Sequence, residues 1–358
     1  MIGKRLRLAR AAAGMSLRDL ASKIGNLVTA QAIGKYERDE SMPGSGVLIA
    51  LAKGLGVSVD YLLGDEQLAI EGVDFRKKAS TSRREEAQVE AKLLHHLERY
   101  LKLEELLGLA SVGWDKPREA PYPARSLEDA EHAAASLRAA WGLGLDPIPN
   151  LAELLEERGI KVFSLDANDI GGLTARVTAP GKAPIPIIVV KHSDWGERKR
   201  FTLAHELGHM LLDPNPDVDA EKASHRFAGA LLMPAEALWR EVGKHRTSIS
   251  VGELVQIKGI FGTSLQAIAY RCRDLGIFGE GLVRRLFMIF NERGWRSYPF
   301  KEPGAIDPKQ EEPRRMDRLC FRALAENAIS EAMAAEILGI SVRDLHQRME
   351  APETVAAE

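Results

Sequence analysis

A thirteen-residue stretch, FTLAHELGHMLLD from Phe201 to Asp213, constrains this chain more than any other part of the sequence. Its apolar residues recur at helical spacing, which predicts a helix that begins near residues 193–194 and is ended by the prolines at 214 and 216. Because each helical residue advances by about 100°, His205 and His209 lie on one face, with Glu206 at its edge. The pattern allows two interpretations: a pair of metal-binding imidazoles, or two core histidines with backbone partners.

Two imidazoles and a neighbouring carboxylate are the groups that metal-assisted hydrolysis needs. His205 and His209 could bind one zinc ion, and Glu206 could take a proton from water so that the water attacks a peptide carbonyl. A catalytic zinc also needs a third protein ligand and an open position. Spacing alone does not choose that ligand among Asp213, Asp217, Asp219, Glu221 and His225.

Length and charge divide the chain into unlike parts. Its 358 residues suffice for two or three domains. The net charge of −2 excludes a protein that is basic throughout, so any nucleic-acid surface must be local. The first 38 residues are such a place, since eight Lys and Arg against two acidic residues give this segment a net charge of +6.

Cysteine content and hydropathy point to the cell interior. The two cysteines, Cys272 and Cys320, are too few for a disulfide framework or a cysteine-rich zinc site. We see no apolar N-terminal segment typical of secretion and no apolar run of about 18 residues. We therefore expect a cytoplasmic protein with no membrane partner.

Helical and strand-like segments alternate along the chain. Residues 1–65 predict short helices, with N-caps at Ser16 and Thr29. Residues 80–107 predict a leucine-rich helix, which could assist dimer formation or be covered within a domain. The proline-rich residues 114–126 then indicate a domain boundary. Beyond it, strands are predicted at 160–165, 171–179 and 185–190, the last central in a sheet. Helices are predicted over 127–140, 151–158, 219–233 and 319–349, a polar loop over 301–315, and residues 281–300 are ambiguous.

The N-terminal segment carries SLRDLA (16–21), KYER (35–38) and LGVS (55–58), and it resembles the XRE class of lambda-repressor-like helix-turn-helix domains. The resemblance implies a dimer on a double-stranded DNA operator, with the third helix in the major groove. Its exposed N-terminal residues would be Ala30, Gln31 and Gly34, following Thr29, and Gln31 could pair with adenine. Arg18, Lys35 and Arg38 would contact phosphates. The turn GNLVT is longer than usual, and a domain used only for protein contact is the alternative.

The central segment carries RFTLAHELGH (200–209), Phe227-Ala228 and LLMP (231–234), and it resembles the ImmA/IrrE family of bacterial metallopeptidases over roughly residues 125–290. The resemblance implies that Glu221 completes the ligand set with His205 and His209, that Glu206 is the base, and that His225 lies beside the ligands or the transition state. Zinc suits these ligands, and Mn²⁺ or Fe²⁺ would also suit them. Substrate would add as a strand along residues 171–177, and His192 is expected on a surface loop.

The expected fold is multidomain: an all-α helix-turn-helix, an α+β zincin-like metallopeptidase domain with a small sheet, and a helical C-terminal module. The predicted parts are residues 1–65, a connector at 66–122, the peptidase domain at 123–290 and the module at 291–358. The module has a second helix-turn-helix-like spacing (Ala335, Leu338, Gly339, Ser341), which we interpret as a docking or dimer element rather than a DNA contact.

Together the two resemblances imply a transcriptional regulator whose endopeptidase domain cleaves a partner protein, such as a repressor or antitoxin, in a stress or mobile-element response. One alternative is a transcription factor whose peptidase-like domain senses a metal or small ligand without proteolysis. Another is an antitoxin that neutralises its partner by binding alone.

Overall fold

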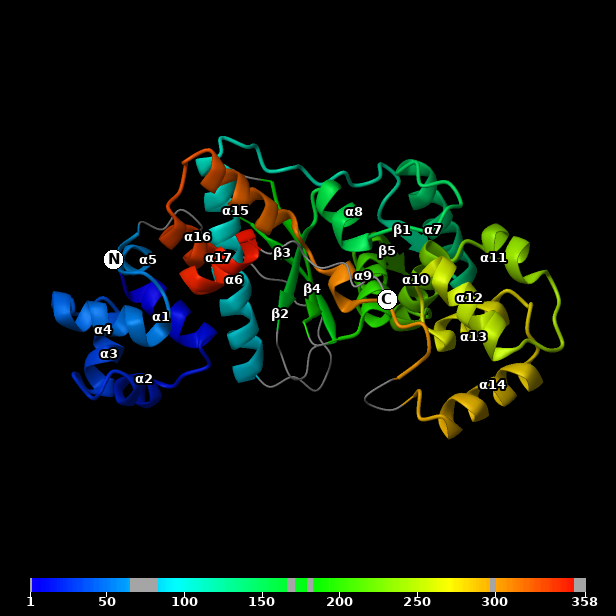
Figure 1. The fold of residues 1–358 in the computed structure, drawn as a ribbon, viewed down its shortest axis with the longest axis horizontal. Helices are drawn as coiled ribbons and strands as arrows, with labels where there is room; N and C mark the ends of the chain where they lie inside the picture. The colour runs from blue at the N-terminus through cyan, green and yellow to red at the C-terminus, as the bar shows by residue number, and fades with distance from the viewer. Residues whose placement is uncertain are drawn as a thin grey trace.

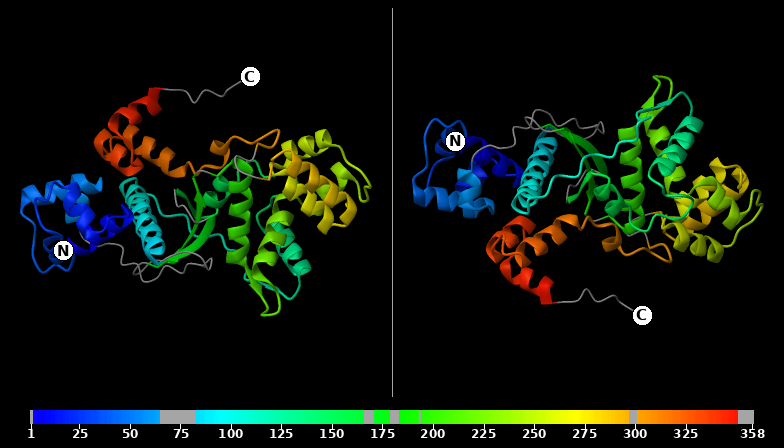
Figure 2. Two further views of the ribbon diagram at one scale, coloured as in Figure 1. Left: turned by 90° about the horizontal axis from the view of Figure 1, so that it is seen from below. Right: turned by 90° about the horizontal axis from the view of Figure 1, so that it is seen from above.

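The computed structural model describes residues 2–64, 83–165, 171–178, 183–192, 194–296 and 301–350, and it describes the side chains of the helix that begins at residue 83 only from residue 88. Figure 1 shows a three-stranded sheet in the middle of an elongated molecule. The N-terminal helices lie at one end and helices α11 to α14 at the other, and the views of Figure 2 agree on this arrangement.

The N-terminal domain is a bundle of five helices with its own core. The helices are α1 (Gly3–Ala12), α2 (Leu17–Lys23), α3 (Ala30–Glu37), α4 (Ser45–Leu55) and α5 (Val59–Leu63). Leu6, Leu20 and Ile33 are fully buried in that core. Both predicted caps are confirmed: Ser16 and Asp19 form a capping box, and the Thr29 hydroxyl accepts from the backbone N–H of Ala32.

The turn between α2 and α3 is long, as the sequence predicted. Six residues separate Lys23 from Ala30, whereas three or four are usual in a helix-turn-helix. Gly25 and Asn26 both adopt positive φ angles, of 71° and 55°, which residues with larger side chains rarely tolerate.

The central sheet has three strands in the order β2-β4-β3. Strand β2 (Lys161–Leu165) pairs in parallel with β4 (Ile185–Lys191), and β3 (Gly172–Val177) pairs with β4 antiparallel. The prediction that residues 185–190 form the central strand is confirmed. Alternate residues of β4 enter different cores, with Ile188 and Val190 on one face and Ile187 and Val189 on the other.

The leucine-rich helix α6 (Arg83–Leu106) covers one face of the sheet. Its fully buried Leu93 and Leu97 share a hydrophobic cluster with Phe163 and Leu173 of the strands. These leucines are therefore internal, and α6 is a covered domain helix; the predicted start near residue 80 lies outside the described residues. The C-terminal helices add to the same cluster: α15 (Arg315–Ala325), α16 (Glu331–Leu338) and α17 (Val342–Glu350). The predicted divisions after residues 65, 122 and 290 remain predictions.

Helices on the other face form the largest core. They are α7 (Leu127–Ala140), α8 (Leu151–Glu157), α9 (Gly196–Leu211) and α10 (Ala220–Leu232). Beyond them lie α11 (Ala235–Val242), α12 (Val251–Phe261), α13 (Leu265–Asp274) and α14 (Glu280–Glu292), the last within the segment that the sequence left ambiguous. Among the described residues, no helix has the length and apolar character needed to cross a membrane.

Two features on this side of the sheet add detail to the predictions. The segment predicted as a boundary contains a strand, because β1 (Tyr122–Ala124) pairs in parallel with β5 (Leu212–Pro214). Helix α9 begins at Gly196, slightly after the predicted start, and ends at Leu211, before the proline at 214. A residue that precedes proline is disfavoured in helical conformation, and the strand pairing satisfies the backbone that leaves the helix.

The described chain is thus multidomain, with an all-α helix-turn-helix domain, a mixed α/β middle containing small sheets, and a helical C-terminal region. This agrees with the fold class predicted from the sequence.

Candidate metal centre

Helix α9 carries the central motif and is buried on almost every side. It packs on β3 and β4, and Leu203, Leu207 and Leu211 are fully buried in the main core. The side chains of His205 and His209 are only 10% and 9% exposed. Two imidazoles in such a place need polar partners, because an unpaired buried polar group is costly.

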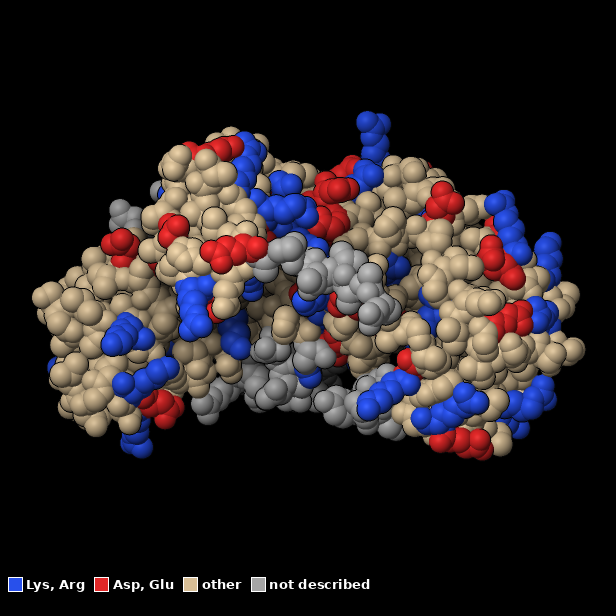
Figure 3. Space-filling view, in the orientation of Figure 1, with Lys and Arg blue, Asp and Glu red and all other residues tan. Residues whose placement is uncertain are grey.

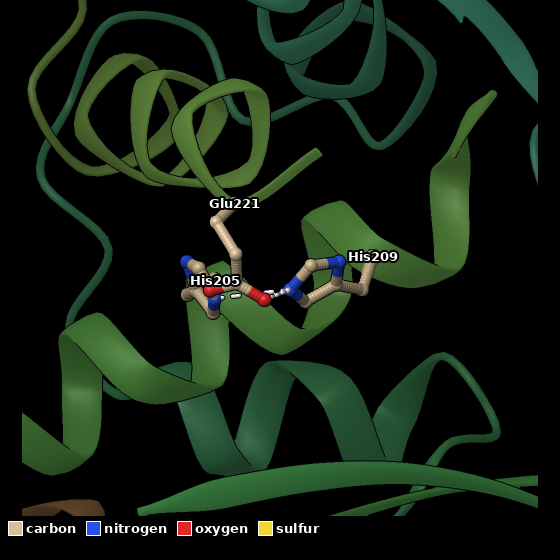
Figure 4. Close-up of side chains that lie close together, drawn as sticks. All are labelled: His205, His209 and Glu221. Atoms are coloured by element: carbon tan, nitrogen blue, oxygen red, sulfur yellow. Dashed lines mark hydrogen bonds and ion pairs between the residues drawn. The ribbon is translucent and has the colours of Figure 1, made fainter. Parts of the chain in front are cut away.

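Glu221 supplies that partner from the neighbouring helix α10. Its carboxylate reaches down onto both imidazoles (Figure 4), with Oε2 3.3 Å from His205 Nε2 and Oε1 3.2 Å from His209 Nε2. The two Nε2 atoms lie 3.0 Å apart. Glu221 is itself 60% exposed, so the cluster is open to solvent on the carboxylate side.

These distances fit a divalent metal ion. Two ligands that each lie about 2.1 Å from a zinc ion in tetrahedral geometry are about 3.4 Å apart. The three separations of 3.0, 3.2 and 3.3 Å are close to that value. Among the residues that the structure describes, His205, His209 and Glu221 are the one group of His, Cys, Asp or Glu close enough together to hold a metal.

Ser224 orients one of the imidazoles. Its Oγ lies 3.1 Å from His209 Nδ1, the ring nitrogen that faces away from the cluster. A hydrogen bond at that atom fixes the ring and leaves Nε2 directed at Glu221. Ser224 is one turn after Glu221 on α10 and is buried. Nothing in the sequence pattern pointed to this residue, because a serine hydroxyl carries no metal-ligand chemistry of its own.

Gly208 explains why α10 can come so close. A Cβ at this position would lie 3.0 Å from Phe227 Cδ1 and 3.3 Å from Ser224 Cα. Both contacts are tighter than ordinary van der Waals separation. A glycine in the middle of the motif therefore allows the two helices to approach until Glu221 reaches the imidazoles.

Glu206 lies on the side of α9 that faces the edge strand β3. It is buried, and a Cβ on Gly172 of β3 would lie 2.7 Å from Glu206 Oε1 and 2.4 Å from Thr202 Cγ2. Only glycine fits there. The carboxylate of Glu206, the residue after His205 on α9, therefore lies against the first residue of the strand.

The other candidates for the site separate into near and distant residues. The ring of the exposed His225 packs at a tilt against two rings of α9, with its centroid 4.4 Å from that of His205 and 5.7 Å from that of Phe201. Asp219 accepts from the backbone N–H groups of Glu221 and Lys222, so it caps α10. Asp213 and Asp217 also lie outside the cluster.

His192 is not brought to the cluster by any contact. Its side chain is 59% exposed, and its Nδ1 lies near Ser164 Oγ and Glu312 Oε1, at 3.3 and 3.4 Å.

Buried ion pairs hold the N-terminal half of α9. The Arg200 guanidinium donates to Glu311 Oε1 at 2.7 Å and to the carbonyls of Phe261 and Pro149. Lys199 pairs with Glu312, and Lys258 joins Glu197 and Glu302 at 2.7 and 3.0 Å.

Glu311 belongs to the segment predicted as a polar loop, which is irregular over most of its length, but the prediction missed that this residue is buried. The residue is 1% exposed and lies in the short 3-10 helix η1 (Pro308–Glu311), where its Oε2 accepts from Leu151 and Ala152 at the start of α8. Burial raises the pKa of Glu311 despite its pairing with Arg200. Charged side chains are buried here because each finds a partner of opposite sign.

A second acidic side chain ties α7 to the helices behind the site. Glu131 accepts from Arg226 Nε at 2.7 Å and from both terminal nitrogens of Arg271. Burial alone would raise the pKa of Glu131, but the two guanidinium groups outweigh burial and lower it.

The third helix of the N-terminal domain, α3, exposes fewer of the residues that the sequence predicted to face DNA. Gln31 and Lys35 are exposed one turn apart, Thr29 and Arg18 are exposed, and Ala30 is half-buried. Gly34 is buried, so the prediction that it is exposed is wrong; it lies against Leu17.

Arg38 is exposed and pairs with Glu40 at 2.6 Å. Over the part of the chain that the structure describes, Figure 3 shows basic and acidic side chains interspersed on the face of the molecule that is also seen in Figure 1.

Comparison with family models agrees with both halves of this description. Residues 6–62 match the helix-turn-helix model, and residues 155–273 match that of the IrrE N-terminal-like domain, a peptidase family. The chain joins a helix-turn-helix domain to an IrrE-like domain. The second match runs from the end of α8 through α13 and contains every residue of the candidate metal centre. Searches among curated proteins and among solved structures found no significant match.

The two matches support DNA binding by the N-terminal domain and a metallopeptidase-like character for the central one. The resemblances stated from the sequence are thereby confirmed.

Proposed function

We propose that this protein is a DNA-binding regulator whose IrrE-like domain is a zinc-dependent endopeptidase. The observation that carries the proposal is the meeting of His205, His209 and Glu221 within hydrogen-bonding distance, while Glu206, next to His205 in the chain, lies against an edge strand. Core histidines with backbone partners would not require a carboxylate from a second helix.

In this proposal the chain's own residues divide the work. His205, His209 and Glu221 hold the ion; zinc is the first choice, and manganese or iron would suit the same nitrogen and oxygen donors. A bound zinc ion would polarise the peptide carbonyl and activate water. Glu206 would accept the proton from that water and pass it to the leaving amine. The exposed His225, whose ring packs against His205, would donate a hydrogen bond to the developing oxyanion.

The substrate would be an extended segment of a partner protein. Strand β3 pairs only with β4 among the described strands, so its other edge can accept a further strand. Its first residue, Gly172, lies against Glu206. A chain that pairs along this edge would therefore pass beside the base. A repressor or antitoxin, controlled in a stress or mobile-element response, is the kind of partner we propose.

The helix-turn-helix domain would bring this activity to an operator in the cytoplasm. We propose that a homodimer binds double-stranded DNA, with Gln31 reading a base and Arg18, Lys35 and Arg38 contacting phosphates. Thr29 and Ala30, at the start of α3, would lie against the groove. Arg38 would exchange its pairing with Glu40 for a phosphate, at small cost because the pair is exposed.

Metal content tests the ligand assignment. The purified wild type should bind one equivalent of zinc, and Glu221→Ala should bind it much more weakly because one of three protein ligands is lost. Glu206→Gln should keep the ion, since Glu206 is not a ligand. The matched control is Glu236→Ala, which removes an exposed glutamate outside the cluster. Equal zinc content in all four proteins would refute the assignment. Zinc-dependent DNA binding without any cleavage would favour a sensor over a peptidase.

A further inference from the structure

The edge of strand β3 that faces away from β4 has a defined set of backbone hydrogen-bonding groups. Pro186 of β4 lies opposite Arg176 of β3 in the antiparallel pair. Two opposite residues that exchange both hydrogen bonds each need an N–H group, and proline has none, so this pair is a non-hydrogen-bonded one. Arg176 therefore directs its backbone N–H and C=O groups away from β4. Because these directions alternate along a strand, Thr174 and Gly172 do the same, and the three residues offer a ladder to an incoming strand.

The side chains at these positions lie on the face of the sheet that carries the candidate metal centre. Leu173 and Val177, which alternate with them, belong to the hydrophobic cluster beneath α6 on the opposite face. A Cβ on Gly172 would instead meet Glu206 of α9. Arg176 shares the face of Gly172 because the register of β3 on β4 is regular between them. It lies four residues further along the strand, about 13 Å from Gly172.

Arg176 is exposed and lies near a second cation. Its guanidinium carbon is 5.8 Å from the ring centroid of Trp114, and Lys116 Nζ is 5.6 Å from the same centroid. The indole ring is half-buried against the main core, so it holds both cations at this end of β3. Asp115, which lies between the tryptophan and the lysine in the chain, pairs with Arg158 at 2.8 Å.

The charge of these two cations is available to a ligand. Within the described part of the chain, no carboxylate lies at ion-pair distance from Arg176 or Lys116. The residues that follow β3 from 179 to 182 lie outside the described residues, and their sequence holds one lysine and no acidic residue. The positive charge at this end of the strand therefore favours an acidic side chain. A guanidinium can donate two parallel hydrogen bonds to one carboxylate, which adds geometric selectivity to the attraction.

We propose that Arg176 and Lys116 form a subsite that selects partner proteins with an Asp or Glu about four residues from the cleaved bond. A strand on this edge that places its cleaved bond beside Gly172 and Glu206 also places a residue opposite Arg176. Residues directly opposite each other carry their side chains on the same face, so an acidic side chain there meets the guanidinium. The proposal rests on the endopeptidase function and adds the class of segment that is cut, one that is extended and acidic on one side of the cut.

A peptide library tests the subsite on the zinc-loaded full chain. The probes are short synthetic peptides of mixed uncharged residues, in which Glu, Gln or Lys is fixed at one position in turn. Mass spectrometry locates each cut relative to the fixed residue. We expect peptides with Glu about four residues from the cut, on one side of it, to have a kcat/KM about tenfold above those with Lys there. Peptides with Gln should fall between them, because the amide carries no charge.

Charge reversal assigns the preference to this subsite. Arg176→Glu should invert it, so that peptides with Lys at that position are cut faster than those with Glu. Lys116→Gln should reduce the preference without inverting it. The matched control is Arg240→Glu, which reverses an exposed charge on α11 and should keep the wild-type preference. Far-UV circular dichroism and zinc content establish that each variant is folded and loaded.

Binding separates the subsite from the endopeptidase function. Zinc-loaded Glu206→Gln should hold the peptides without cutting them, and fluorescence anisotropy of labelled peptides measures their affinity with and without Arg176→Glu. A preference for Glu that Arg176→Glu inverts, in cleavage or in binding, supports the subsite. If it is found in binding while the wild type cuts no peptide, the edge docks acidic strands and the endopeptidase function fails. If cleavage and binding both ignore the fixed residue, the subsite is overturned, whether or not the peptides are cut.

Discussion

Replacing Gly172 with alanine should damage the candidate site without touching a metal ligand. The new Cβ would lie 2.4 Å from Thr202 Cγ2 and 2.7 Å from Glu206 Oε1. Carbon atoms in contact are normally about 3.5–4.0 Å apart, so strand β3 and helix α9 must separate by about 1 Å. Overpacking of this kind costs about 1–3 kcal/mol of stability. A displacement of about 1 Å at a catalytic group can lower the rate about 100-fold.

The assay compares Gly172→Ala with Gly259→Ala, whose Cβ would meet nothing within 4 Å. Denaturant unfolding should show a loss of stability for Gly172→Ala. For Gly259→Ala it should show a gain in stability of up to about 1 kcal/mol, since alanine is a better helix former than glycine. Zinc affinity should stay near the wild-type value in both, because the three ligand residues come from α9 and α10 rather than β3. Cleavage that depends on Glu206 should fall only in Gly172→Ala. Wild-type stability and cleavage in Gly172→Ala would refute the close approach of strand and base.

Three further changes test other parts of the account. Ser224→Ala should weaken zinc binding about 10–100-fold, because the His209 ring loses the hydrogen bond that orients it; equilibrium dialysis would measure this, and an unchanged affinity would contradict the role. Glu131→Gln should lower the free energy of unfolding by about 2–3 kcal/mol at neutral pH, since Arg271 loses its charged partner. This value is below that for a fully buried ion pair because Glu131 is partly exposed. Because the pKa of Glu131 is lowered in the folded state, its contribution to stability is present above the ordinary carboxyl pKa and is lost as the pH falls below about 4. The free energies of unfolding of the wild type and Glu131→Gln should therefore converge at low pH. A difference that stays constant with pH would contradict the pairing. Gln31→Ala should reduce discrimination among operator sequences more than total affinity, as measured by DNA-binding titrations, and equal losses on all sequences would argue against a base contact.

Local patterns predicted the helices and the central strand well. The predicted bounds 127–140 are those of α7, because amphipathic spacing and N-cap residues act within a few positions. Spacing along a helix also predicted that His205 and His209 share a face. It could not select Glu221, since that choice depends on how α10 packs on α9, and only the family resemblance singled the residue out.

Long-range contacts were missed for the same physical reason. The pairing of β1 with β5 joins residues about 90 positions apart, and Arg200 and Glu311 are separated by 111. No local pattern reports a partner at such a distance. A run of Pro, Lys and Glu indicates a solvated loop unless a buried charge elsewhere needs a partner. Arg200 is that charge, and its pairing with Glu311 holds η1 against the helix of the candidate metal centre.

The central claim is that Glu206 acts in proteolysis at this site. Its most direct test compares newly formed protein N-termini in source cells carrying the wild type or Glu206→Gln, both unstressed and after DNA damage or oxidative stress. The account predicts at least one cleavage product that forms only with the wild type, while both purified proteins hold the same amount of metal. Identical N-termini under every condition, with equal metal content, would contradict it.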